Sequence, residues 1–261
     1  METNQNTQSI LAEKDKNAVS LELMRRMKLH GMANAFMESL NNTVAENMTA
    51  DAFVSMLVSR EWDYRSAAAI QRLIKSANFR YPNAFPEQID YLTPRNLERN
   101  QMERILSLDF VDQGRDVFIT GPSGTGKSFL ATAIGYEACK KGLKTMYANA
   151  AKLLGSLKVA KQKNLLEPEL RKIEKVPLLI LDDLFLVTLD PKERAILMEI
   201  IEDRHGRKSM IITSQYPVDK WYQAIGDPTV ADAIMDRIAH TSIRVELTGE
   251  SMRKTKSKKS K

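Results

Sequence analysis

GPSGTGKS, residues 121–128, is the stretch that decides the fold, because it stands between an apolar run and a helical run. It matches the pattern G-x4-G-K-[ST], in which glycines let the backbone turn its N–H groups inward around phosphates. Lys127 can reach the β- and γ-phosphates of a nucleotide, and the Ser128 hydroxyl can ligate Mg²⁺. We therefore expect nucleotide binding by the whole loop and the residue after it: Gly121, Pro122, Ser123, Gly124, Thr125, Gly126, Lys127, Ser128 and Phe129.

Short β-rich runs alternate with helical runs around this loop. The candidate strands are residues 117–120, 145–148, 178–181, 210–213 and 243–247, with helical segments such as Ser128–Lys141 between them. Strands separated by helices are typical of βαβ units, so we expect an α/β fold with a parallel sheet and helices on both faces. The first 110 residues lack strand alternation and predict a small all-α domain before the sheet.

An acidic pair follows the third candidate strand in LLILDD, residues 178–183. We expect Asp182 to orient Mg²⁺ through water and Asp183 to polarise the attacking water, with Lys127 as the second catalytic group. The next strand, SMIITSQ, ends in Thr213, Ser214 and Gln215, and we assign Ser214 and Gln215 to the nucleotide. Ordinary strand-end turn chemistry is the alternative. No N-K-x-D signature occurs, which favours ATP over GTP.

Composition and punctuation divide the chain into four parts. We expect a helical domain at 1–80, a linker and helix packed on the core at 81–110, the ATPase domain at 111–252 and a disordered basic tail at 253–261. Within the second part, Thr93-Pro94 predicts the start of a helix that runs to about Leu106.

The net charge of +6, from 39 Lys+Arg and 33 Asp+Glu, resides entirely in the last nine residues. A solubilising tail and a polyanion-binding tail explain it equally well. Residues 138–166 hold seven lysines and no acid, and a solvated helix face is the alternative to DNA binding there. We expect sequence-independent contacts to DNA phosphates from two groups of cations: Lys152, Lys158, Lys161 and Lys163 in this run, and Arg72 and Lys75 before it.

The chain lacks the sequence features of secreted and membrane proteins. The start, METNQNTQSI, has no apolar signal-peptide core, and the longest apolar run is too short to span a bilayer. Cys139 is the only cysteine, which excludes an internal disulfide and a cysteine metal cage. We expect a soluble, cytoplasmic protein.

Several motifs together resemble the IstB/DnaC-like branch of AAA+ ATPases, and most closely the IstB-type helper of insertion-sequence transposition. They are GPSGTGKS, LLILDDL, IITSQYP, AIMDRIAH and VELTGESMRK, with KLHGM, the Glu61…Arg65 pair and ANFRYP before them. The resemblance covers roughly residues 20–254. Many AAA+ ATPases carry Asp-Glu where this chain has Asp182-Asp183, which leaves the rate of hydrolysis open.

The resemblance implies an ATPase that uses ATP and Mg²⁺, assembles as a homo-oligomer on duplex DNA and acts with the transposase of the same element. The N-terminal domain would then mediate self-association and contacts to DNA and partner. Arg237 would complete the site of a neighbouring subunit, and Arg253 would sense the nucleotide in its own. A local ion pair with Asp232 or Asp236, and membership of the basic tail, are the respective alternatives.

Three other functions remain open from sequence. One is a replicative helicase loader of the DnaC type, which grips single-stranded DNA. Another is a nucleotide-gated DNA-binding adaptor with little turnover. A small-molecule kinase would need a lid over the phosphate acceptor, and no such segment is found in the sequence.

Overall fold

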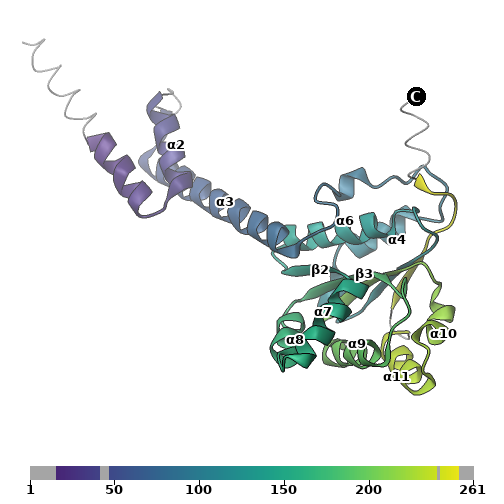
Figure 1. Cartoon of the computed structure of the whole chain (residues 1–261). Coiled ribbons are helices and arrows are strands. Elements are labelled where there is room, and N and C mark those ends of the chain that lie inside the picture. The colour runs from purple at the N-terminus through teal and green to yellow at the C-terminus, as the bar shows by residue number, and fades with distance from the viewer. Residues whose placement is uncertain (1–15, 42–46, 240–241, 253–261) are drawn as a thin grey trace, which may run out of the picture. The chain divides into compact units, whose positions relative to one another are not determined.

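A computed structural model of the chain describes residues 16–41, 47–239 and 242–252 (Figure 1). The expected tail at 253–261, and Arg253 with it, lies outside the described residues. The chain divides into two compact units, Met1–Gln71 and Arg72–Lys261. Among the described helices, none has both the length and the apolar composition that crossing a lipid bilayer requires.

The first unit is helical. Its helices are residues 16–26, α2 (His30–Asn41) and most of α3 (Ala50–Ala77), whose last turns belong to the second unit. Gly31 lets α2 approach α3 closely, because a Cβ there would lie 2.4 Å from the carbonyl oxygen of Arg60. Glu61 joins the helices: Oε2 accepts from the Met32 amide at 3.0 Å, and Oε1 accepts from Arg65 Nε at 2.6 Å. The KLHGM motif and the Glu61–Arg65 pair therefore fix one helix crossing.

Five parallel strands form the sheet of the second unit, in the order β2-β3-β4-β1-β5. Their bounds are β1 (Val117–Thr120), β2 (Thr145–Asn149), β3 (Leu178–Leu184), β4 (Ser209–Ser214) and β5 (Ile243–Glu246). β4 lies between β1, the strand that precedes the loop, and the acidic strand β3, and the predicted α/β fold with a parallel sheet is confirmed. The carboxyl ends of all five strands meet at one edge, because every pairing is parallel.

Helices cover both faces of this sheet (Figure 1). One face carries α4 (Arg99–Leu106), α5 (Asp109–Asp112) and α6 (Lys127–Lys140). The other carries α7 (Ala150–Gln162), α8 (Leu166–Glu174), α9 (Pro191–Arg204), α10 (Trp221–Ile225) and α11 (Pro228–Ala239). Strand residues alternate between the two cores: Leu178 and Ile180 of β3 pack toward α6, whereas Leu179 and Leu181 pack toward α7 and α9. Both faces bury apolar surface, which explains the uninterrupted apolar run in β3.

The helix expected to open at Thr93-Pro94 begins instead at Arg99. The Asp90 carboxylate accepts from the amides of Leu92 and Thr93 and from the Thr93 hydroxyl, which holds this segment as a turn. Because the Thr93 hydroxyl is bound to Asp90, three residues earlier, it does not cap the amides of a following helix.

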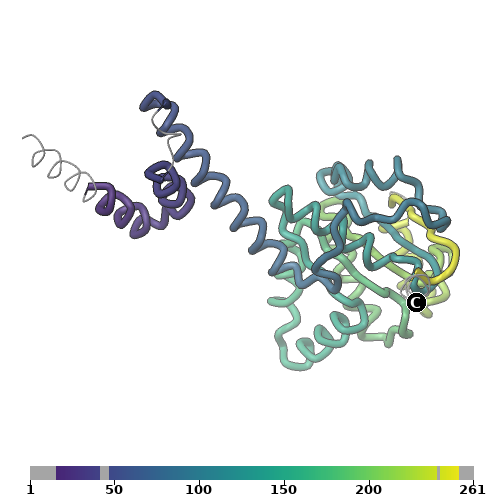
Figure 2. The backbone as a smooth tube through the Cα atoms, turned by 90° about the horizontal axis from the view of Figure 1, so that it is seen from above, coloured from purple at the N-terminus to yellow at the C-terminus, as the bar shows by residue number. Residues whose placement is uncertain are grey.

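The segment after β5 returns across residues 90–98, and Figure 2 shows these two stretches, yellow and blue, side by side. The Thr248 amide donates to the Arg95 carbonyl at 3.0 Å, and the Asn96 side chain donates to the Glu246 carbonyl at 2.9 Å. The end of the sheet and the segment before α4 therefore form one wall beside the 121–128 loop.

Candidate nucleotide-binding site

The 121–128 loop leaves β1 and enters α6, and its three glycines have left-handed backbone angles. The φ values are 140° at Gly121, 86° at Gly124 and 98° at Gly126. Side chains would also collide there: a Cβ on Gly124 would lie 2.1 Å from Ser251 Oγ, and one on Gly126 would lie 2.4 Å from Arg95 Nη1. Glycine is thus required both for the turn and for the close packing behind it.

Lys127 is the first residue of α6 and is 5% exposed. Its ammonium group donates to the carbonyls of Gly121 at 2.7 Å and Pro122 at 2.9 Å. The Pro122 carbonyl also accepts from the buried Thr125 hydroxyl at 2.9 Å. Cation, hydroxyl and carbonyls thus hold the curvature of the loop at the positive end of a helix, where anions are stabilised.

A cavity of about 340 Å³ opens over the loop. Of the nine residues predicted in and just after the loop, six line it: Ser123, Gly124, Gly126, Lys127, Ser128 and Phe129. Asp183 and Gln215 from the next two strand ends also line it, as do four residues that were not predicted: Arg80, Tyr81, Leu186 and Met252. Gly121, Pro122 and Thr125 lie behind the lining, where they shape the loop.

A β-bulge in β3 brings the two acids together, with Asp183 on the cavity wall and Asp182 buried behind it. Leu181 pairs with Ile212 and Leu184 with Ser214, so Asp182 and Asp183 stand opposite the single residue Thr213. Asp183 has a left-handed φ of 59°. In a regular strand, consecutive side chains point to opposite faces; with the extra residue here, both carboxylates reach one partner, Arg80.

Asp182 is fully buried and accepts hydrogen bonds on both oxygens. The Thr213 hydroxyl donates to Oδ1 at 2.6 Å, and the Tyr147 hydroxyl donates to Oδ2. Burial and this hydrogen bond raise the pKa of Tyr147 above its usual range, which keeps the phenol protonated. The negative charge of Asp182 is therefore compensated by hydrogen bonds inside the protein, as a buried carboxylate requires.

Arg80 bridges the acid pair. Its Nη1 lies 3.3 Å from Asp182 Oδ2 and 3.0 Å from Asp183 Oδ2. Burial opposes its charge, but Tyr81 and the two carboxylates raise the pKa of Arg80 further. Arg80 stands in the ANFRYP motif, yet nothing in its local spacing relates it to acids about a hundred residues later.

The expectation for Ser214 is corrected. Its side chain is fully buried, and its hydroxyl donates to the Leu184 carbonyl at 2.8 Å, so it ties β4 to β3 and does not face the cavity. Gln215, one residue later, does line the cavity. Thr213, which was one of three candidates at this strand end, contacts the acids.

Arg95 supports the loop from behind. It is 3% exposed; Nη1 donates to the Thr125 carbonyl at 2.6 Å and Nη2 donates to the Asp90 carbonyl at 2.7 Å. Sequence reasoning missed it, because a buried arginine without an acidic partner has no local pattern. The collision of a Cβ on Gly126 with this guanidinium explains why the loop needs its last glycine.

Arg237 does not line the cavity of its own chain. Its Nε pairs with Glu202 Oε2 of α9 at 2.5 Å, and its Nη1 donates to the Ala233 carbonyl at 2.8 Å. A local ion pair is thus present, although its partner is neither Asp232 nor Asp236. The side chain is 26% exposed, so the guanidinium stays accessible from outside.

The expected DNA-binding cations differ in how they are held. Lys158 pairs with Asp190 at 2.6 Å and with Glu193 at 2.9 Å, both in the capping box of α9. This joins α7 to α9, so a free Lys158 cation is not available on the surface. For the other five, all exposed, no side-chain ion pair is recorded in the described part of the chain: Arg72, Lys75, Lys152, Lys161 and Lys163.

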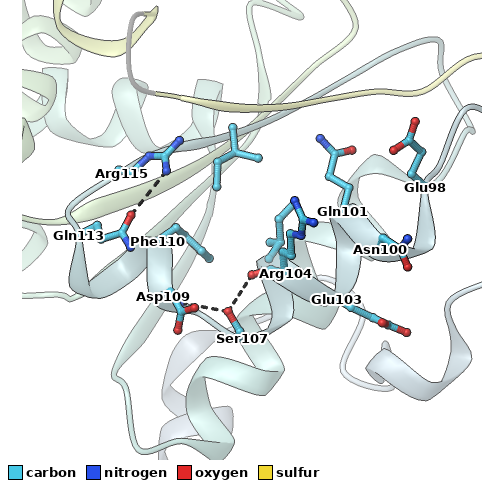
Figure 3. A pocket seen from close by; sticks show the side chains of 12 residues that line it. Glu98, Asn100, Gln101, Glu103, Arg104, Ser107, Asp109, Phe110, Gln113 and Arg115 are labelled. Atoms are coloured by element: carbon cyan, nitrogen blue, oxygen red, sulfur yellow. Dashed lines mark hydrogen bonds between the residues drawn. The ribbon is translucent and has the colours of Figure 1, made fainter.

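A separate hollow of about 1040 Å³ lies between α4, α5 and the start of β5 (Figure 3). Its labelled side chains mix both charge signs, and at one side of it Arg115 donates to Gln113 at 3.5 Å. None of the predicted site residues lines it. The cavity over the 121–128 loop is therefore the better candidate for chemistry.

Comparison with known proteins agrees with this site. A family model described as "IstB-like ATP binding protein" matches residues 22–260. A putative insertion sequence ATP-binding protein, y4pL of Sinorhizobium fredii, is 39% identical over 92% of this chain and 98% of its own length. The insertion sequence IS5376 putative ATP-binding protein of Geobacillus stearothermophilus is 31% identical over 89% of this chain and 92% of its own.

Solved structures extend the likeness of the fold. The DnaC helicase loader is 24% identical with a TM-score of 0.53, over 64% of this chain and 98% of that one. DnaI is 22% identical with a TM-score of 0.54, over 69% of this chain and 92% of that one. At these identities the likeness is one of AAA+ fold alone.

Proposed function

Because the chain belongs to the family of IstB-like ATP-binding proteins, we propose that it is the ATP-hydrolysing helper of an insertion sequence, which assembles on duplex DNA and recruits or stimulates the transposase of the same element. The observation that carries this proposal is the cavity over the 121–128 loop, which joins an anion-binding helix start to an acid pair.

The donor set fits ATP and Mg²⁺. The phosphates are held by the loop amides, the start of α6 and Lys127. The glycines keep the loop amides accessible, because no Cβ obstructs the loop there. Ser128 and Asp182 hold Mg²⁺, and a cation bound there supplies charge neutralisation on the phosphates. Asp182 is buried behind the cavity wall, so it would orient Mg²⁺ through a water molecule rather than by direct contact.

Asp183 is the group that polarises the attacking water. It lines the cavity with a 16% exposed side chain, whereas Asp182 is sealed. Its backbone is fixed, because its amide donates to Thr213 Oγ1 at 2.9 Å. Gln215, on the cavity wall, is the polar group placed to sense the terminal phosphate.

Assembly with ATP brings Arg237 into the site of the neighbouring subunit. Two facts support this role: Arg237 is absent from the cavity of its own chain, and it is anchored by Glu202 with part of its surface exposed. A guanidinium supplied in trans neutralises charge on the γ-phosphate and couples hydrolysis to assembly.

Duplex DNA is held by the unpaired cations Lys152, Lys161 and Lys163, with Arg72 and Lys75 as a second group. The first unit mediates self-association and partner contacts. On α3, Val54, Val58 and Trp62 follow at four-residue spacing and are 58%, 53% and 72% exposed, an apolar stripe suited to protein contact.

The insertion-sequence role is favoured over the helicase-loader role by the extent of similarity. The relatives from Sinorhizobium fredii and Geobacillus stearothermophilus with insertion-sequence names match 92% and 89% of the chain, whereas the DnaC helicase loader covers 64% of it. Lys127→Ala should abolish ATP binding under either function, whereas the adaptor with little turnover is distinguished by Asp183→Asn, which should stop turnover in an ATPase.

ATP hydrolysis measured with duplex and with single-stranded DNA tests the proposal. Stronger stimulation by duplex DNA, with a further increase when the transposase encoded beside the gene is added, is the expected result. Stronger stimulation by single strands would favour the helicase loader. A rate that Asp183→Asn leaves unchanged would favour the adaptor.

A further inference from the structure

Arg80 is the side chain at the nucleotide cavity whose role the proposed function leaves unexplained. One nitrogen, Nη1, contacts a carboxylate oxygen of both Asp182 and Asp183. These are the two acids assigned to metal and water, so Arg80 occupies the place between them where a positive charge is most stabilised.

The segment that carries Arg80 is anchored on both sides. Phe79 packs edge-on against Tyr147 with ring centroids 6.5 Å apart, and Tyr147 itself donates to Asp182. A Cβ on Gly135 of α6 would lie 2.8 Å from Phe79, so the ring sits close against that helix. The Arg80 side chain, by contrast, is 44% exposed and lines the cavity with Tyr81. The neighbouring residue Phe79 is thus anchored, whereas the Arg80 side chain reaches the open side of the cavity, where a metal ion from solution can compete with it for the acids.

Two carboxylates beside a phosphate site repel an anionic ligand unless a cation lies between them. Arg80 supplies that cation from within the chain, and Mg²⁺ supplies it from solution. We propose that Arg80 is a built-in counter-ion of the acid pair, which Mg²⁺ displaces, so that this residue sets how strongly nucleotide affinity depends on the metal. The inference rests on the proposed function, because it assumes that ATP and Mg²⁺ bind in this cavity.

Linkage gives the expected measurement. Without metal, Arg80→Gln leaves the acids uncompensated, so ATP binds more weakly than to the unmodified chain. With saturating Mg²⁺, the metal neutralises the acids in both proteins and the affinities converge. The ratio of dissociation constants without and with Mg²⁺ should therefore rise by about tenfold in Arg80→Gln.

The experiment is equilibrium binding of ATP to the full chain in EDTA and in Mg²⁺, with three comparisons. Arg80→Lys keeps the charge and should return the ratio toward that of the unmodified chain. Arg104→Gln, in the hollow of Figure 3, removes an exposed guanidinium with no recorded ion pair in the described residues and should leave the ratio unchanged. In a background that carries both Asp182→Asn and Asp183→Asn, Arg80→Gln should have a much smaller effect.

Each contrary result is decisive. An unchanged ratio in Arg80→Gln, with ATP binding intact, overturns the counter-ion role alone. A full effect of Arg80→Gln in the background with both Asp182→Asn and Asp183→Asn also overturns it, because Arg80 would then act on the nucleotide and not through the acids. Failure of the unmodified chain to bind ATP in either condition rejects the proposed function itself.

Discussion

The Thr213 hydroxyl joins the two acids of the site: it donates to Asp182 Oδ1 at 2.6 Å and accepts from the Asp183 amide at 2.9 Å. Thr213 is fully buried and stands alone opposite the bulge that holds both acids. One hydroxyl therefore sets the orientation of the metal-binding acid and the backbone of the hydrolytic acid.

Thr213→Val removes this hydroxyl at nearly constant volume. It leaves a buried carboxylate oxygen and a buried amide without their partner, so the free energy of unfolding should fall by about 1–3 kcal/mol. Hydrolysis should fall about 10- to 100-fold, because a group that orients a metal ligand is lost. Urea unfolding and steady-state ATP hydrolysis measure the two effects.

Thr132→Val is the matched control. Its hydroxyl is equally buried, but it donates to the Ser128 carbonyl within α6 and contacts neither acid. Its effect on hydrolysis should be small. Equal losses of activity in the two variants would mean that Thr213 acts through general stability and not through the acids.

The fold was largely predictable because local patterns determined it. The apolar run of β3 and the loop at 121–128 required a buried strand and a strand–turn–helix unit, and the alternation of strands with helices predicted the parallel sheet. The helix start at Thr93-Pro94 was wrong, because the side chain of Asp90 holds that segment as a turn. The Thr-Pro motif alone does not show that Asp90, three positions earlier, binds the Thr93 hydroxyl that would otherwise cap the helix.

The residues of the site were predictable where each belongs to a short continuous sequence motif. Lys127, Ser128 and Asp183 were found from two motifs and line one cavity. Tyr147 and Arg80 were missed, since each meets Asp182 only through tertiary structure. Ser214 was assigned to the nucleotide because strand-end position alone cannot say which of three consecutive side chains faces inward, and the bulge in β3 decides it.

Arg237→Ala should leave ATP binding intact and reduce hydrolysis by about a thousandfold, if the guanidinium acts on the γ-phosphate of a neighbour. Titration with ATP and steady-state hydrolysis separate the two properties. Glu202→Gln removes the anchor and keeps the arginine, so its loss of activity should be much smaller. An equal loss of ATP binding in Arg237→Ala would reject the role in trans.

Mixing two inactive variants tests the same arginine more directly. Subunits with Arg237→Ala keep Asp183, and subunits with Asp183→Asn keep Arg237, so a neighbour pair can form one complete site. An equal mixture should recover about a quarter of the unmodified activity. In random assembly, about a quarter of the heterologous interfaces join a subunit that keeps Asp183 to a neighbour that keeps Arg237. A mixture as inactive as either variant would indicate that Arg237 acts within its own subunit.

Lys152 and Lys163 lie eleven positions apart, and so about three turns along one exposed face of α7 and its end. If both contact phosphates, the double change to Ala should reduce the slope of log affinity against log salt concentration by about 2. Lys158→Ala is the control, because its ammonium group is held by Asp190 and Glu193. A slope that falls equally in the control, or in neither protein, would reject this face as the DNA contact.

Asp116 makes folding stability depend on pH. It is 8% exposed and accepts from the Met210 amide at 2.7 Å, and burial raises its pKa from 3.8 to about 7, against the effects of that hydrogen bond and of Arg204. Between those two values the folded chain binds a proton that the unfolded chain has lost. Stability from this group is therefore complete below about pH 4 and is lost as pH rises to about 7, by up to about 1.4 kcal/mol per pH unit.

Asp116→Asn keeps the acceptor for Met210 and cannot ionise, so it should match the protonated chain at every pH. The expected result is a variant as stable as the unmodified protein near pH 4.5 and more stable at pH 8. Asp112→Asn, an exposed acid nearby, should leave the pH profile unchanged. Unfolding free energies measured across this range decide the point, and parallel profiles for Asp116→Asn and the unmodified chain would show that Asp116 titrates at its ordinary pKa.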